Sequence, residues 1–313
     1  MDISVVIPMY GCRAAVPELY RRLTETVGKI AGSYEIIMVD DCCPQNSWEE
    51  IEKLCSKDEH VVGIHLSRNF GQIRAITAGL DYCKGDWVVV MDCDLQDRPE
   101  SIIDLYNKAN EGYDVVFTKR QGRKDTFLTK FMSRCFYRVY NYFTDGNYDP
   151  AICNFSIARR VVIDYYCQMR EQNRAYTMFV KWLGFRQTSI ELQEDKRFEG
   201  KSSYSFRKKL NLAFEVITSQ SNKPLKFSIH LGFTIALIAL IYIIYLIIRT
   251  LAVGDVLTGW TTIVASIYLM GGLILASVGI VGIYTGNIFN ETKKRPIYIV
   301  EKCLNGQVKK PEE

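Results

Sequence analysis

The sequence lacks the charge and the cysteine spacing of several common protein classes. Its 313 residues carry a formal net charge of only +4, so bulk charge does not indicate a nucleic-acid partner. None of the ten cysteines forms a C-x₂-C pair, which excludes the usual structural zinc site. The only adjacent cysteines, Cys42 and Cys43, make a poor disulfide, so reduced thiols in a cytosolic domain are the simplest interpretation.

Two sequence signals are missing as well. No G-x-x-x-x-G-K-[ST] segment is present, which excludes a P-loop as the means of holding phosphate. The first ten residues, MDISVVIPMY, are too short in their apolar part and too acidic at their start for a signal peptide. We therefore expect neither a P-loop enzyme nor a cleaved secretory leader.

Residues 1–120 alternate between strand-like and helix-like patterns. The apolar, β-branched runs expected to form strands are 3–8, 35–40, 61–66, 87–92 and 114–118. The helical patterns between them lie near 14–31, 47–56, 72–83 and 100–111. This alternation predicts an α/β fold with a mostly parallel, Rossmann-like sheet covered by helices on both faces. In such sheets ligands bind beyond the carboxyl ends of the strands, which is where Asp40, Asp41 and Asp92 fall.

The stretch GDWVVVMDCDLQDRPE, residues 85–100, crowds carboxylates at the end of a predicted core strand. A solvated loop that caps a helix explains Asp97 well but leaves the close spacing of Asp92 and Asp94 unexplained. A divalent cation between these carboxylates would cancel their repulsion, and Mg²⁺ is usually held by one or two carboxylates plus substrate phosphates. The pattern therefore favours a metal site.

Two apolar runs near the C-terminus, 227–248 and 261–289, contain no Asp, Glu, Lys or Arg. Each is long enough to cross a bilayer, which takes about 20 helical residues. Basic residues flank the outer ends of the pair, and the short connection between the runs is poor in them. The positive-inside rule then predicts that the large domain and both termini are cytoplasmic. We expect the membrane to be the inner or plasma membrane of a bacterium. The flanking residues are Lys223, Lys226, Lys293, Lys294 and Arg295.

Two stretches next to these runs combine basic residues with an apolar or aromatic face. They are 128–144 and 206–219, and we expect amphipathic helices that lie at the membrane surface, although ordinary surface helices remain the alternative. The predicted organisation is a catalytic domain at 1–205, a second interfacial helix at 206–224, two spans at 225–290 and a tail at 291–313. A site close to the bilayer indicates a lipid-linked substrate.

Five motifs along the chain resemble those of the family-two glycosyltransferases that act on polyprenyl phosphates. They occur in the family's order and read SVVIPMYGC, EIIMVDD, NFGQIRAITAGL, VVVMDCDLQDRPE and RFEGKSSYSFRKKL. Members of this family include dolichyl-phosphate mannose synthase and the bactoprenol glucosyltransferases, the latter also with two C-terminal spans. The resemblance implies a GT-A fold and transfer of a sugar from a nucleotide diphosphate, UDP- or GDP-linked, to a polyprenyl phosphate.

The resemblance also implies roles for individual residues. A divalent metal, Mg²⁺ or Mn²⁺, is expected on Asp92, Asp94 and Gln96, with Asp94 also catalytic. The nucleotide pocket is expected to contain Pro8, Tyr10, Asp40, Asp41 and Asp92. The donor and lipid phosphates are expected to meet Arg120, Lys130, Ser133, Arg197 and Ser202.

The chain departs from the family at three places. Gly11-Cys12 stands where many relatives have Asn-Glu, and Ser203 where relatives often have Lys, so one nucleotide contact and one positive charge are absent. Asn154 stands where bacterial relatives have an Asp assigned as general base, and an amide cannot accept a proton. Either the acceptor phosphate reacts as a dianion without a base, which we favour, or a carboxylate such as Asp94 or Asp149 assists.

We therefore expect a membrane glycosyltransferase with a nucleotide sugar and a lipid phosphate as its partners, and no nucleic acid. Two alternatives are a glycosyltransferase with a glycolipid or saccharide acceptor and a catalytically silent scaffold that binds nucleotide sugar. The spacings Gly272-x-x-x-Ala276 and Gly282-x-x-x-Gly286 allow close helix contact, either between the two spans or in a homo-oligomer.

Overall fold

The computed structural model of the protein describes residues 1–120, 138, 141–143, 149, 151–192, 217–218, 221–253 and 259–306. The chain forms two compact units. The first contains Met1–Phe131, Tyr148–Tyr204 and Arg295–Glu313, and the second contains Met132–Asn147 and Ser205–Lys294. Most of the predicted interfacial stretches, 128–144 and 206–219, lie outside the described residues.

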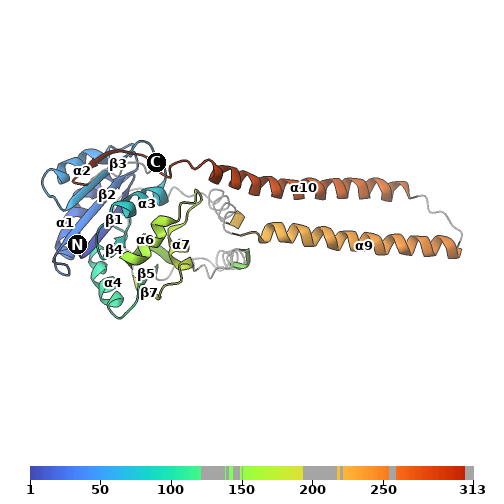
Figure 1. The fold of residues 1–313 in the computed structure, drawn as a ribbon, viewed down its shortest axis with the longest axis horizontal. Helices are drawn as coiled ribbons and strands as arrows, with labels where there is room; N and C mark the ends of the chain where they lie inside the picture. Colours follow the sequence, from blue (N-terminus) through green and yellow to red (C-terminus); the bar gives the residue numbers. More distant parts are fainter. Residues whose placement is uncertain are drawn as a thin grey trace. The chain divides into compact units, whose positions relative to one another are not determined.

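The elements of the first unit follow the expected alternation of strands and helices as far as residue 120 (Figure 1). Its strands are β1 Ile3–Met9, β2 Tyr34–Asp40, β3 Val61–Leu66, β4 Trp87–Val90, β5 Val115–Arg120, β6 Ile152–Arg159, β7 Gln187–Leu192 and β8 Val300–Leu304. Its α-helices are α1 Val16–Val27, α2 Ser47–Cys55, α3 Gln72–Tyr82, α4 Ile102–Ala109, α6 Arg160–Gln168 and α7 Tyr176–Trp182. Short 3₁₀ turns, η1 Arg13–Ala15 and η2 Pro99–Ser101, precede α1 and α4.

The eight strands form one sheet in the order β7-β5-β6-β4-β1-β2-β3-β8. The central strands β4, β1, β2 and β3 are parallel, as are β5 and β7. Only β6 and β8 run against their neighbours. The mostly parallel sheet predicted from the sequence is therefore confirmed.

Helices cover both faces of this sheet. The apolar sides of α1, α2 and α4 pack on one face, and those of α3, α6 and α7 pack on the other. Because β1 is covered on both sides, all seven of its residues are buried, as its unbroken apolar run indicates. Gly79 lets α3 lie close to this strand, since a Cβ there would stand 2.3 Å from Val6 Cγ1.

Three strands of the sheet were not among the predicted elements. β6 pairs antiparallel with both β4 and β5, and β7 extends the sheet beyond β5. β8 lies within residues 291–313, which the sequence pattern assigns to a tail, and it pairs with β3 more than 200 residues earlier in the chain. Such pairings depend on contacts that a local apolar pattern does not contain.

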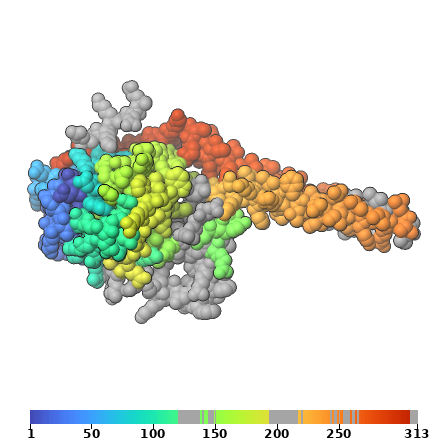
Figure 2. Space-filling view, turned by 60° about the horizontal axis from the view of Figure 1, so that its bottom comes forward, coloured from blue at the N-terminus to red at the C-terminus, as the bar shows by residue number. Residues whose placement is uncertain are grey.

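The second unit contains two long helices, α9 Lys223–Val253 and α10 Trp260–Thr292, of 31 and 33 residues. They lie side by side, and Ser228 Oγ donates a hydrogen bond to Ser277 Oγ at 2.9 Å. Lys223–Tyr242 and Ser266–Thr292 are long and apolar enough to be candidate membrane spans, and neither is buried within the protein. Figure 2 shows the extended outer surface of α9 in orange.

Among the described residues, three glycines of the small-residue spacings in α10 make no close contact with α9. Gly272, Gly282 and Gly286 are exposed, and a Cβ at any of them would meet nothing within 4 Å among the described residues beyond its own helix backbone and chain neighbours. The contact with α9 instead uses the side of α10 that carries Ser277.

Candidate active site

The predicted site residues gather at one edge of the sheet. β1, β2 and β4 end there, and Met9 pairs with Asp40 at the last position of the β1–β2 ladder. Backbone hydrogen bonds continue the β1–β2 and β1–β4 pairing past the strand ends. Asp41 N donates to Met9 O at 3.1 Å, and Met91 N donates to Val6 O at 3.1 Å. The loops that follow these three strands therefore begin next to one another.

The antiparallel strand β6 brings Asn154 to the same edge. Val90 pairs with Ser156, and the same register continued by two residues sets Asn154 across from Asp92. β5 ends at this edge too, since Lys119 pairs with Ile152 at the beginning of β6. The edge therefore contains Asp92, Asn154 and the end of β5 with Arg120, which the sequence pattern alone does not place together.

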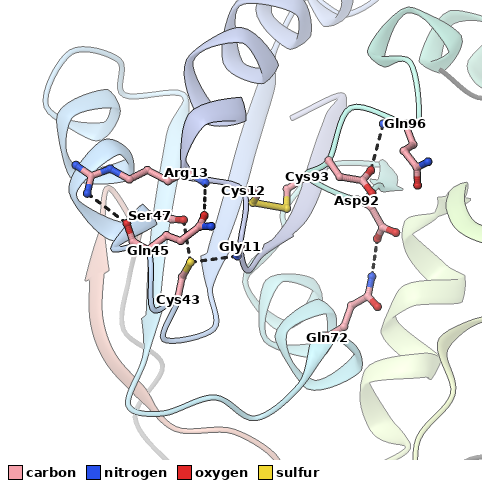
Figure 3. The surroundings of a disulfide bond; sticks show 11 residues. Gly11, Cys12, Arg13, Cys43, Gln45, Ser47, Gln72, Asp92, Cys93 and Gln96 are labelled. Carbon is pink, nitrogen blue, oxygen red and sulfur yellow. Dashed lines mark hydrogen bonds between the residues drawn. A yellow bond between two sulfur atoms is a disulfide. The ribbon is translucent and has the colours of Figure 1, made fainter. Parts of the chain in front are cut away.

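In the loop after β4, buried and partly exposed side chains alternate. Asp92, Asp94 and Gln96 are partly exposed, and the residue before each of them is buried: Met91, Cys93 and Leu95. Leu95 has a φ of +57°, a left-handed conformation that keeps this alternation through the turn. Asp92 Oδ1 accepts a hydrogen bond from Gln72 Nε2 at 2.7 Å, and Asp94 Oδ1 accepts one from Gln96 N at 3.1 Å (Figure 3).

These three side chains fit the predicted cation by their chemistry. Two carboxylates and one amide supply only oxygen ligands, which Mg²⁺ and Mn²⁺ prefer. All three side chains are partly exposed to solvent. Within the described ranges no group of three or more His, Cys, Asp or Glu side chains is arranged to hold a metal.

Asp40 is buried at the end of β2, with 1% of its surface exposed. Its Oδ2 lies 2.8 Å from His65 Nδ1, while Oδ1 has no hydrogen-bond partner among the described residues. Burial raises the pKa of the Asp40 carboxyl, and the contact with His65 opposes that rise. The His65 ring also packs against Trp48 in a tilted arrangement, with ring centroids 5.0 Å apart, and its Nε2 lies 3.9 Å from Glu301 Oε2 on β8.

Asp41 anchors the loop that leads into α3. Its two carboxylate oxygens accept hydrogen bonds from Phe70 N at 2.7 Å and Gly71 N at 2.8 Å. Gly71 has a φ of +95°, which residues with a side chain rarely adopt, so this position favours glycine. Burial raises the pKa of Asp41 and the two backbone N–H groups oppose that rise.

The other predicted residues differ in how they are placed. Pro8 is buried within β1, while Tyr10, just after the strand, exposes 54% of its surface. Asn154 is partly buried in β6, and its backbone carbonyl accepts a hydrogen bond from Ser156 Oγ at 2.9 Å. Four predicted phosphate-binding residues lie outside the described residues: Lys130, Ser133, Arg197 and Ser202.

Asp149, a candidate base, is paired with a lysine. Lys119 Nζ lies 2.9 Å from Asp149 Oδ2, and Ala151 N donates to Asp149 Oδ1 at 3.0 Å. Burial acts to raise the pKa of Asp149, but these hydrogen bonds outweigh it and hold the pKa below its usual value. A carboxylate with a lowered pKa is a weaker base.

The structure corrects the expectation that the cysteines of this domain are all reduced. Cys12 and Cys93 form a disulfide between the loops that follow β1 and β4 (Figure 3). The two residues are 81 positions apart, and they meet because β1 and β4 are neighbours in the sheet. Sequence reasoning also missed Gln72 and His65; the polar His65 within an otherwise apolar strand was the one local signal.

The first unit is thus a mostly parallel, Rossmann-like sheet with acidic and amide side chains at its carboxyl edge. A family model described as glycosyl transferase family 2 matches residues 4–167. The chain belongs to glycosyltransferase family 2, which confirms the predicted family and the predicted class of enzyme.

Relatives match the chain along nearly its whole length. A Bacillus subtilis (strain 168) protein named "Uncharacterized glycosyltransferase YkcC" is 36% identical over 303 residues, covering 96% of this chain and 94% of the relative. The undecaprenyl-phosphate 4-deoxy-4-formamido-L-arabinose transferase of Proteus mirabilis (strain HI4320) is 33% identical over 312 residues, covering 99% and 95%. The chain thus has relatives named as polyprenyl-phosphate sugar transferases, as predicted.

A solved structure supports the fold alone. Mannosyl-3-phosphoglycerate synthase from Rubrobacter xylanophilus superposes with a TM-score of 0.50 at 13% sequence identity, covering 69% of this chain and 72% of that one. The GT-A fold predicted from the sequence is confirmed.

Proposed function

We propose that this glycosyltransferase moves a sugar from a nucleoside-diphosphate sugar to a polyprenyl phosphate at the cytoplasmic face of a bacterial membrane, in a reaction that needs a divalent metal. The observation that carries the proposal is the similarity to the Proteus transferase, which covers 99% of this chain. It therefore includes both the catalytic unit and the two candidate spans. The name of that relative identifies a lipid phosphate, undecaprenyl phosphate, as its acceptor.

In the proposed reaction an oxygen of the lipid phosphate forms a bond to the anomeric carbon of the sugar. The bond from that carbon to the diphosphate breaks, and the nucleoside diphosphate leaves with the electron pair. A phosphate monoester has its second pKa near about 6, so at neutral pH the acceptor is mostly a dianion and needs no base. The task of the protein is then to position the two charged substrates and to screen their charge.

The lowered pKa of Asp149 supports this account over a carboxylate base at that position. Asp149 is held ionised by Lys119, and protonating it would break that contact. Asn154, across the sheet register from Asp92, can orient the acceptor phosphate by donating a hydrogen bond from its amide.

Asp92, Asp94 and Gln96 would hold the metal, which stabilises negative charge on the departing diphosphate as a Lewis acid. Gln72 orients Asp92 through its 2.7 Å hydrogen bond. For the nucleotide, we assign direct contact to the exposed Tyr10, which follows β1. The buried Pro8, Asp40 and Asp41 would shape the pocket from behind. Each of these roles is part of the proposal.

The positively charged side chains complete the site. Arg120 follows Lys119 at the end of β5, and we propose that it receives the lipid phosphate together with Lys130 and Ser133. Arg197 and Ser202 would contact the donor phosphates, as a guanidinium fork suits bidentate phosphate binding.

The test is sugar transfer by the purified full-length protein in detergent. The assay would contain a short polyprenyl phosphate, Mg²⁺ or Mn²⁺, and each member of a panel of radiolabelled UDP- and GDP-sugars. Asp94→Ala should abolish transfer of label to the lipid phase. The matched control is Asp104→Ala, which removes an exposed carboxylate on α4 away from the site and should leave transfer unchanged.

Each outcome separates the proposal from its alternatives. Metal-dependent labelling of the lipid, lost in Asp94→Ala, supports the proposed reaction and identifies the donor. If label is transferred only when a glycolipid or saccharide is supplied, the proposed polyprenyl-phosphate acceptor is wrong and that molecule is the acceptor. Nucleotide-sugar binding without transfer to any acceptor would contradict the proposed enzyme activity and favour a silent scaffold.

A further inference from the structure

The Cys12–Cys93 disulfide lies inside the candidate active site. Cys12 follows Tyr10 and Gly11 at the end of β1, and Cys93 stands between Asp92 and Asp94 (Figure 3). The Cα atoms of the two cysteines are 6.3 Å apart, within the range that a disulfide spans without moving the backbone. The bond therefore joins the loop proposed for the nucleotide to the loop proposed for the metal.

The two sulfur atoms lie beneath these loops rather than on their open side. Cys12 and Cys93 expose 4% and 7% of their surfaces and belong to the apolar cluster under α1 and α4. The side chains of Asp92 and Asp94 are partly exposed, in alternation with the buried residues. The bond thus fixes the distance between the two loop backbones without occupying the place where a substrate would bind.

A third cysteine strengthens the connection on the β1 side. The Sγ of Cys43, after β2, accepts hydrogen bonds from Gly11 N at 3.1 Å and from Ser47 Oγ at 3.2 Å. Gly11 has a φ of +72°, so the chain turns sharply just before Cys12. Three neighbouring loops are therefore held through sulfur at the carboxyl edge of the sheet.

We propose that Cys12 and Cys93 are a reversible oxidation site that slows the transfer reaction when the disulfide forms. A bond between the two loops restrains the separation that donor entry and nucleoside-diphosphate release require, and such steps commonly limit turnover. The reduced pair leaves the loops free to move apart. The effect on turnover rests on the proposed function, whereas the formation of the bond does not.

The oxidant in this proposal is a low-molecular-weight disulfide. The sulfur of one cysteine attacks it, forming a mixed disulfide and releasing one small thiol, and the second cysteine then displaces the other small thiol. The protein loses two electrons and two protons, and the small disulfide becomes two thiols. A small thiol in excess reverses both steps and restores the reduced protein.

The test uses full-length protein in detergent, equilibrated with glutathione and glutathione disulfide over a range of ratios. Free thiols are then blocked by alkylation, and the cross-linked peptides are identified by mass spectrometry. The same samples are assayed for lipid-linked sugar and for binding of UDP and GDP. The variants are Cys12→Ser and Cys93→Ser, which cannot form the bond, and Cys42→Ser, which removes an exposed cysteine nearby and keeps the pair.

We expect a Cys12–Cys93 cross-link that forms and disappears with the glutathione ratio, and a fall in turnover of about fivefold or more as it forms. Cys12→Ser and Cys93→Ser should show no such response, and Cys42→Ser should respond like the parent. The absence of this cross-link at the most oxidising ratio would overturn the proposal. A cross-link that changes neither turnover nor nucleotide binding would overturn the regulatory role.

The two proposals fail in distinguishable ways. If the cross-link forms and alters UDP or GDP binding but no lipid is labelled in either state, the oxidation site stands and the proposed transfer reaction fails. If the cross-link forms but lipid is labelled equally at every glutathione ratio, the transfer reaction stands and the regulatory role of the disulfide fails.

Discussion

At the scale of single residues, the two adjacent aspartates after β2 have different partners. Asp40 faces His65 with one carboxylate oxygen, whereas both oxygens of Asp41 are used by backbone N–H groups of the loop before α3. The two residues are adjacent in the motif EIIMVDD but have different roles. Asp41 stabilises the local structure, and Asp40 is a buried charge.

For Asp41 we predict a loss of stability on removal of the carboxylate. Asp41→Ala leaves Phe70 N and Gly71 N without their acceptor, and hydrogen bonds to a charged group contribute about 1.5–3 kcal/mol each. The free energy of unfolding should fall by about 2–4 kcal/mol, measured by denaturant titration followed through tryptophan fluorescence. Asp104→Ala on the exposed side of α4 is the control, and an equal effect in both variants would contradict the prediction.

For Asp40 we predict a pH dependence of stability. Burial raises the pKa of its carboxyl above that of the unfolded chain, so its contribution to stability is present at low pH and lost as the pH rises through the folded-state pKa. Asp40→Asn carries no charge, and its melting temperature relative to the parent should therefore rise as the pH increases above the pKa of an unfolded-chain aspartate.

Asp2→Asn provides a control of opposite sign for the Asp40 measurement. Hydrogen bonds from Ser33 lower the pKa of Asp2, so its contribution to stability is present above the unfolded-state pKa and lost as the pH falls. The melting temperature of Asp2→Asn relative to the parent should move downward as the pH rises. Parallel curves for the Asp40→Asn protein and the parent would contradict the account of Asp40.

At the scale of elements, a buried carboxylate connects three parts of the fold. Asp81, near the end of α3, accepts hydrogen bonds from Arg170, after α6, at 2.7 and 2.9 Å. It accepts a third from Tyr298 Oη, just before β8, at 2.7 Å. Asp81 is 6% exposed, so its charge depends on these donors. The segment that leads into β8 is thereby attached to the face of the sheet that α3 and α6 cover.

We predict that Arg170→Ala weakens this connection, because it leaves a buried carboxylate with too few donors. Arg170 itself is half exposed, so we expect a loss of about 2–3 kcal/mol in unfolding free energy, below the usual cost of breaking a fully buried pair. The matched control is Arg159→Ala, whose contact with Asp114 at 3.3 Å is exposed and should contribute less than about 1 kcal/mol. Similar losses in both variants would count against the role of Asp81.

At the scale of the whole molecule, the chain combines a family 2 catalytic unit with two candidate membrane spans. Lys293, Lys294 and Arg295 follow the second span, and by the positive-inside rule they should lie in the cytoplasm. We predict that trypsin cleaves there in inverted membrane vesicles and leaves the site intact in sealed cells. Cleavage from outside intact cells, detected with an antibody against the C-terminus, would contradict the proposed orientation. Detergent-permeabilised cells are the control for access of the protease.

The sequence by itself determined the features that depend on local interactions. Strands β1–β5 and helices α1–α4 fall close to the predicted ranges, because short apolar runs and helix periodicity are patterns among residues a few positions apart. The uncharged runs in α9 and α10 were equally evident, and the spacing of Asp92, Asp94 and Gln96 pointed to the loop after β4.

Only the tertiary structure decided which distant segments meet. β8 joins β3, Asn154 comes to the edge that carries Asp92, and Gln72 reaches Asp92 from α3. Cys12 and Cys93 are joined across 81 residues, a contact that the spacing of the cysteines in the sequence does not predict. The physical reason is that strand pairing and side-chain contacts of this kind are selected by packing of the complete core, whereas a sequence pattern reports only the interactions within a few residues.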